Sequence, residues 1–123
     1  MPSTVLVAED HEELIELYET ALRQAGYNVV EARNGRQTIR LLDSMEPPPD
    51  VVYLDIEMPD LPGTRALDHI RQTPRLQGVR VIVITANEGY RDRVGDLADA
   101  FIVKPIALGE LLELTARLAR KPG

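Results

Sequence analysis

The chain has 123 residues, about one domain with a single hydrophobic core, so a two-domain enzyme is excluded. Hydrophobic residues make up 44% and charged residues 28%, close to the globular average, which excludes a disordered or fibrous chain. The formal net charge is −6, from 14 Lys and Arg against 20 Asp and Glu, so we expect no direct contact with nucleic-acid phosphates.

Two absences narrow the class of protein further. The chain has no cysteine, which removes disulfides, thiolate metal sites and thiol nucleophiles. No apolar stretch approaches the roughly 20 residues that span a bilayer, and no apolar run follows a basic start at the N-terminus. We therefore expect a soluble cytoplasmic protein without a membrane partner, folded as one domain over residues 1–123.

Five short apolar runs, rich in β-branched residues, are typical of strands covered on both faces. In chain order they are Val5–Ala8, Val29–Val30, Val51–Leu54, Val81–Thr85 and Phe101–Val103. A helical pattern lies between the first two runs and ends at Gly26. Its predicted buried face consists of Leu14, Leu17, Ala21, Leu22 and Ala25.

The remaining runs are also separated or followed by helical patterns. A helix opens at Gly35 and cannot pass the proline run 47–49, which predicts a tight loop. Later helices are expected over Thr64–Gln72, weakly between Glu88 and Leu97, and over Leu108–Arg120. This alternation predicts an α/β fold with a doubly wound parallel sheet and helices on both faces.

Polar residues follow four of the five predicted strands. They are Glu9 and Asp10 after the first strand, Asp55 after the third, Thr85 at the end of the fourth and Lys104 after the fifth. Ligands of doubly wound sheets bind beyond the carboxyl ends of the strands, where these residues are expected to meet.

The three acids of this group would repel one another unless a cation joined them. All the available ligands are oxygens, and His11 and His69 have no partner at ligand spacing and are expected to be solvated, so Mg²⁺, or else Mn²⁺, is favoured over zinc. Lys104 and Thr85 fit the remaining oxygens of a phosphoryl group, and Asp55 fits a nucleophile that forms an acyl phosphate.

These residues resemble the response-regulator receiver domains of two-component signalling, the CheY-like superfamily. The matching segments are Val-Leu-Val-Ala-Glu9-Asp10, the acceptor segment from Pro49 to Gly63 around Asp55, Val-Ile-Val-Ile-Thr85-Ala86, and Phe-Ile-Val-Lys104-Pro105. Each segment alone is a weak signal, but four in order at predicted strand ends are highly specific. The resemblance covers essentially the whole chain and implies a five-stranded sheet in the order 2-1-3-4-5.

The resemblance also implies a role for each matching residue. Asp55 would be the phosphoacceptor. The cation ligands would be Asp10 and Asp55 directly, Glu9 mainly through water, and the backbone carbonyl of Glu57. Thr85, Ala86 and Lys104 would contact the phosphoryl group, Thr85 and Phe101 would form the switch, and the Lys104–Pro105 peptide bond would be cis. Glu57 and Asn87 would tune hydrolysis of the acyl phosphate.

The implied partners are a histidine kinase or histidine phosphotransfer protein as donor, and a downstream protein target or effector domain. The output surface would lie around the fourth helix, fifth strand and fifth helix. Between Thr85 and Lys104 the chain is about one helical turn shorter than the family pattern, so a short fourth helix is expected, and a phosphorylation-linked homodimer through that face is in doubt.

Three alternatives stay open from the sequence. A flavodoxin-like cofactor binder shares the fold but needs a phosphate-cradling loop where this chain has an acidic one. A magnesium-dependent phosphatase uses an aspartyl intermediate, although its nucleophile normally follows the first strand. A degenerate receiver would act only as a protein-binding scaffold.

Overall fold

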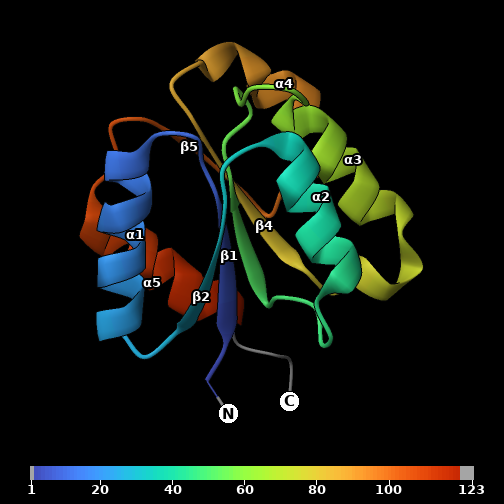
Figure 1. The fold of residues 1–123 in the computed structure, drawn as a ribbon. Helices are drawn as coiled ribbons and strands as arrows, with labels where there is room; N and C mark the ends of the chain where they lie inside the picture. The colour runs from blue at the N-terminus through green and yellow to red at the C-terminus, as the bar shows by residue number, and fades with distance from the viewer. Residues whose placement is uncertain (1, 120–123) are drawn as a thin grey trace.

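Five parallel strands form a single sheet in the computed structural model, which describes residues 2–119 (Figure 1). The strands are β1 (Thr4–Ala8), β2 (Asn28–Ala32), β3 (Val51–Leu54), β4 (Arg80–Thr85) and β5 (Ala100–Val103). Their order across the sheet is β2-β1-β3-β4-β5, which confirms the predicted doubly wound fold. The order reverses direction beside β1, so the carboxyl ends of β1 and β3 flank a crevice.

Helices cover both faces of the sheet, as the sequence predicts (Figure 1). The helices α1 (Glu12–Gln24) and α5 (Leu108–Ala119) pack on one face. On the other face lie α2 (Gly35–Ser44), α3 (Gly63–Gln72) and α4 (Arg91–Val94), with the short 3₁₀ helices η1 (Pro74–Leu76) and η2 (Glu88–Tyr90) beside them. The predicted end of the last helix at Arg120 lies outside the described residues.

The strands supply two separate hydrophobic cores because successive side chains point to opposite faces. Val5 and Val7 join the core beneath α1 and α5, whereas Leu6 and Ala8 join the core beneath α2 and α3. Burial on both faces explains why the central strands β1, β3 and β4 read as continuous apolar runs, whereas the edge strands β2 and β5 are only partly buried. None of the described helices is both long and apolar enough to cross a membrane.

The predicted buried face of α1 is wrong in part. Ile15, Tyr18 and Leu22 are the buried residues of the helix, whereas Leu17 is 48% exposed and Ala25 is also exposed. The helix is rotated so that the ring of Tyr18 packs edge-on against Tyr53 of β3, with ring centroids 5.7 Å apart. Burying the larger aromatic surface of Tyr18 stabilises the fold more than burying Leu17 would.

The fourth helix is short, as expected, because α4 contains four residues. The chain after it is held to the rest of the domain by Arg71 of α3, whose Nε donates to the backbone oxygen of Leu97 at 2.7 Å. A terminal nitrogen of Arg71 also lies 2.9 Å from Asp99 Oδ2. The same carboxylate accepts a hydrogen bond from the amide of Val81 at 2.7 Å, which ties this segment to β4.

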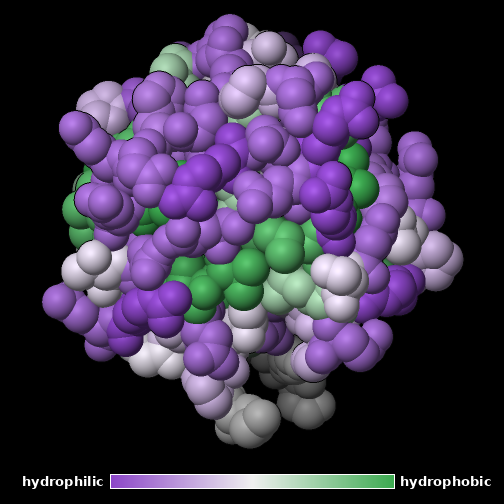
Figure 2. Space-filling model, in the orientation of Figure 1, coloured by the Kyte–Doolittle hydropathy of each residue, from purple (hydrophilic) through white to green (hydrophobic). Residues whose placement is uncertain are grey.

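The surface seen in the orientation of Figure 1 is mostly hydrophilic, with a hydrophobic patch over the β2 edge of the sheet (Figure 2).

His69 differs from the expected solvated side chain. Its ring is 29% exposed, and Nε2 lies 2.7 Å from Asp43 Oδ1, which links α3 to α2.

Candidate functional site

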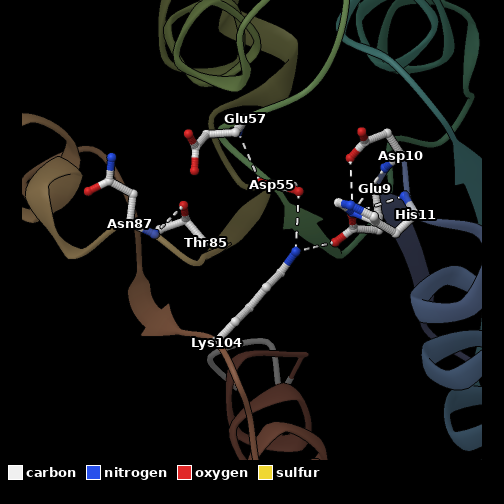
Figure 3. A network of polar contacts seen from close by, with 8 residues as sticks. All are labelled: Glu9, Asp10, His11, Asp55, Glu57, Thr85, Asn87 and Lys104. Carbon is white, nitrogen blue, oxygen red and sulfur yellow. Dashed lines mark hydrogen bonds and ion pairs between the residues drawn. The ribbon is translucent and has the colours of Figure 1, made fainter.

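The carboxyl edge of the sheet brings together the residues that the sequence places at strand ends (Figure 3). Glu9 and Asp10 follow β1, Asp55 follows β3, Thr85 ends β4 and Lys104 follows β5. Parallel pairing sets this convergence, because Ala8 is in register with Leu54 and Thr85 with Val103. Each of these side chains therefore stands at or directly after the end of a strand, and β1, β3 and β4 are largely buried.

Lys104 bridges the two most deeply buried acids of the site. Its Nζ lies 2.8 Å from Glu9 Oε1 and 3.3 Å from Asp55 Oδ2. The Glu9 residue is 2% exposed and Asp55 is 4% exposed, so the ammonium group is their shared neutralising charge. The sequence places both residues at this edge of the sheet, but it does not reveal that Lys104 pairs with Glu9 as well as with Asp55.

The two acids respond to this arrangement in opposite ways. Burial alone raises the pKa of Glu9, but hydrogen bonds from Lys104 and His11 outweigh it and lower the pKa to about 2. Burial, followed by the negative charge of Glu9, raises the pKa of Asp55 to about 6. Lys104 therefore neutralises the charge of Glu9 better than that of Asp55. A further cation would stabilise the ionised Asp55 carboxylate most.

A divalent cation fits the acidic group on two observations. Glu9, Asp10, His11 and Asp55 each offer one ligand atom, and these atoms all lie within 4.8 Å of one another. Opposite ligands of one Mg²⁺ stand about 4 Å apart, so small side-chain movements close the set. In addition, Asp10 Oδ1 is buried and accepts no hydrogen bond from any described residue, which leaves its lone pairs free for a cation.

His11 is the member of this group that the sequence interpretation missed. The side chain is 66% exposed, which agrees with the expected solvation, yet Nδ1 lies 2.9 Å from Glu9 Oε2 and 3.4 Å from Asp10 Oδ1. The position of His11 in the sequence was the only sign that it belongs to this group, because an imidazole directly after two acids at a strand end shares their crevice. The expectation that neither histidine has a partner at ligand spacing is therefore wrong for His11.

Glu57 enters the site through its backbone. Its amide donates to Asp55 Oδ1 at 3.0 Å, which fixes one oxygen of the Asp55 carboxylate. The Glu57 side chain is exposed, and Lys104 pairs with Glu9 and Asp55 instead (Figure 3). The roles of the Glu57 carbonyl as cation ligand and of its side chain in hydrolysis stay predictions.

The loop after Asp55 is shaped by Gly63, the first residue of α3. The Gly63 amide donates to the backbone oxygen of Ile56 at 2.8 Å. A Cβ at this position would overlap the Asp55 backbone, so no other residue allows the loop to fold so closely over Asp55. This close contact keeps Asp55 at its place beyond β3.

Thr85 and Asn87 form the opposite side of the site (Figure 3). Thr85 is fully buried, and its hydroxyl accepts a hydrogen bond from the Asn87 amide at 3.1 Å. The Asn87 side chain in turn accepts from the Gly89 amide at 2.9 Å, which caps η2. Ala86, between them, is exposed.

Phe101 and Pro105 lie on either side of the Lys104 position. Phe101 is half-buried, and the guanidinium carbon of Arg91 lies 4.7 Å from the centre of its ring. The peptide bond between Lys104 and Pro105 is cis. The switch roles of Thr85 and Phe101 stay predictions.

Comparison with known proteins agrees with this geometry. The family profile described as the response regulator receiver domain matches residues 5–116. Response regulator MprA of Mycolicibacterium vanbaalenii is 35% identical over 98% of this chain and 52% of its own length. The chain belongs to the response regulator receiver domain family, and it spans about half the length of the first curated relatives that it matches.

Solved structures give the same result. Response regulator TrrA of Thermotoga maritima, in complex with Mg²⁺ and beryllofluoride, is 31% identical with a TM-score of 0.84, covering 94% of this chain and 98% of its own. The receiver domain of the sensor histidine kinase PA1611 of Pseudomonas aeruginosa, with magnesium in its active-site cleft, is 26% identical with a TM-score of 0.86, covering 97% and 98%. The acidic group of this chain suits the same cation.

Proposed function

We propose that this chain accepts a phosphoryl group on Asp55 from a phosphohistidine of a histidine kinase or histidine phosphotransfer protein, in a cytoplasmic two-component phosphorelay. One observation carries the proposal: the buried Asp55 carboxylate contacts Lys104 and belongs to an acidic group that suits a divalent cation. A carboxylate with this surplus of negative charge gains stabilisation whenever a dication and a phosphoryl group arrive together.

The chemical step would be an in-line displacement at phosphorus. An Asp55 carboxylate oxygen forms the new P–O bond, the P–N bond to the donor imidazole breaks, and the imidazole keeps that electron pair. Mg²⁺, held by Asp10, Asp55 and the Glu57 carbonyl, with Glu9 acting through water, would neutralise phosphoryl charge. Lys104 and Thr85, with the Ala86 amide, would hold the remaining phosphoryl oxygens.

The surface beside the acceptor suits a protein donor. A pocket of about 590 Å³ is lined by His11, Glu13, Leu14, Leu17, Ala86 and Lys104. Leu17 is the one large hydrophobic side chain that is exposed among residues 2–119. An apolar contact with Leu17, at the edge of this pocket, would hold a donor helix while the phosphohistidine of the donor reaches Asp55.

Phosphorylation would act on a two-state equilibrium rather than build a new structure. Thr85 would move toward the phosphoryl group, Phe101 would follow, and the surface of α4, β5 and α5 would present a changed face to a protein target or effector domain. Because α4 is short, β5 and α5 supply most of that face, including any phosphorylation-linked homodimer contact. The chain would catalyse no reaction other than its own phosphorylation and dephosphorylation.

The direct test is incubation of the chain with acetyl phosphate, with Mg²⁺ or with EDTA, followed by intact-mass measurement. The expected result is one added phosphoryl group on the wild type with Mg²⁺ and none with EDTA or on Asp55→Asn. Phosphorylation of Asp55→Asn to the same extent would contradict the proposal. Steady release of phosphate from a phosphomonoester would favour the phosphatase alternative, and a wild type that is never phosphorylated would favour the scaffold.

A further inference from the structure

The acidic group contains one donor that is chemically different from the rest. Glu9, Asp10 and Asp55 offer carboxylate oxygens, whereas His11 offers an imidazole nitrogen within the same 4.8 Å cluster. Carboxylates suit Mg²⁺, while imidazole adds affinity for transition-metal dications and little for Mg²⁺. The choice of cation at this site therefore depends on whether His11 is a ligand.

The backbone leaves the ring of His11 free for this role. His11 is the residue before the first turn of α1, in an extended conformation, and its side chain makes no capping hydrogen bond to the helix. The ring folds back over the acids instead, so that Nδ1 faces both Glu9 and Asp10 (Figure 3). The ring therefore lies at ion-pair distance from both carboxylates, so Nδ1 is already beside the oxygens that would bind a cation.

The hydrogen bonds around Nδ1 permit the exchange of a proton for a cation. Glu9 Oε2 accepts from the amides of Asp10 and His11 at 3.1 and 3.2 Å, so it stays bonded when Nδ1 turns to a cation. Asp10 Oδ1 is buried without a hydrogen bond from any described residue and lies 3.4 Å from Nδ1. A cation bound to both atoms would give the Asp10 oxygen a close partner in place of the hydrogen bond that it lacks.

We infer that His11 Nδ1 is a ligand of the cation site. The site consequently binds transition-metal dications such as Co²⁺ more tightly than Mg²⁺, with a larger ratio of affinities than its oxygen ligands alone would give. The inference rests on the proposed function, because it takes the acidic group to be the cation site of the phosphoacceptor. Mg²⁺ binds without needing the nitrogen, so His11 sets selectivity among cations rather than the ability to bind one.

The test is calorimetric titration of the untagged chain with Co²⁺ and with Mg²⁺, on the wild type and on His11→Ala. The expected result is a loss of about tenfold or more in Co²⁺ affinity and less than about threefold in Mg²⁺ affinity. His11→Gln keeps a hydrogen-bond donor for Glu9 and should lose Co²⁺ affinity to the same extent. His69→Ala removes the other histidine of the chain, which is bonded to Asp43 in α2, and should behave as the wild type.

Pulsed electron paramagnetic resonance of the Mn²⁺-loaded chain gives an independent readout. Histidine nitrogen coupling should be present in the wild type and His69→Ala, and absent in His11→Ala. The inference is overturned if the wild type shows no nitrogen coupling, or if His11→Ala and the wild type have the same ratio of Co²⁺ to Mg²⁺ affinity. A wild type that Mg²⁺ and acetyl phosphate do not phosphorylate would instead refute the proposed function, and nitrogen coupling from His11 would still support the inference.

Discussion

Replacing the Asp55 carboxylate should stabilise the cation-free protein. The pKa of Asp55 is raised from 3.8 to about 6, mainly by burial and then by the charge of Glu9. The folded state therefore holds the Asp55 proton more tightly than the unfolded state, and ionisation of Asp55 opposes folding as the pH rises from about 4 to about 6. Asp55→Asn keeps the shape of the side chain without the charge and removes this penalty.

The size of the effect follows from the pKa. The interval between 3.8 and about 6 corresponds to about 3 kcal/mol above pH 7, which is an upper figure because Lys104 also loses a contact. We expect Asp55→Asn to raise the free energy of unfolding by about 1–3 kcal/mol at pH 7.5, and the midpoint temperature by roughly 5–10 °C. At pH 4 the gain should fall below about 1 kcal/mol, because Asp55 is then protonated in the folded state.

The assay is thermal and urea unfolding in EDTA at both pH values, followed by circular dichroism. Asp68→Asn is the matched control, since Asp68 is exposed on α3 and should change stability by less than about 0.5 kcal/mol. The reasoning is refuted if Asp55→Asn is no more stable than the wild type at pH 7.5, or if its gain is the same at pH 4.

Three further predictions follow from the same contacts. Glu9→Gln should destabilise the cation-free protein by about 2–3 kcal/mol at pH 7, because the pKa of Glu9 is lowered to about 2. In urea titrations, the difference in unfolding free energy between the variant and the wild type should shrink as the pH falls below about 4.5. A difference that stays constant with pH would contradict this prediction. Gly63→Ala should cost about 1–3 kcal/mol in the same assay, since its Cβ meets the Asp55 backbone, and an unchanged unfolding midpoint would contradict that overlap. Leu17→Glu should slow phosphoryl transfer from a histidine kinase that phosphorylates the wild type, and it should leave labelling by acetyl phosphate unchanged. Equal slowing with both donors would argue against a docking role for Leu17.

The convergence of the site could be predicted from the sequence because it depends on topology. Short β-branched runs alternating with helical patterns define parallel strands, and parallel strands place their carboxyl ends at one edge. Glu9, Asp10, Asp55, Thr85 and Lys104 each follow or end such a run, so their meeting needs no knowledge of side-chain packing.

The side-chain arrangement could not be predicted in the same way. The apolar residues of α1 satisfy two overlapping stripes, and only the packing of Tyr18 on Tyr53 decides that Leu17 faces solvent. The contact of His11 with Glu9 and the closer approach of Lys104 to Glu9 than to Asp55 both depend on side-chain rotamers. Such choices are set by tertiary contacts, which periodicity does not encode.

The central claim is that Asp55 captures a phosphoryl group with the help of a cation held by its acidic neighbours. A crystal structure of the chain grown with Mg²⁺ and beryllofluoride tests it most directly. We expect beryllofluoride on an Asp55 oxygen, Mg²⁺ between Asp10 and Asp55, and Lys104 turned from Glu9 toward a fluoride. Beryllofluoride or Mg²⁺ bound elsewhere, with the Lys104–Glu9 pair intact and Asp55 bare, would contradict it.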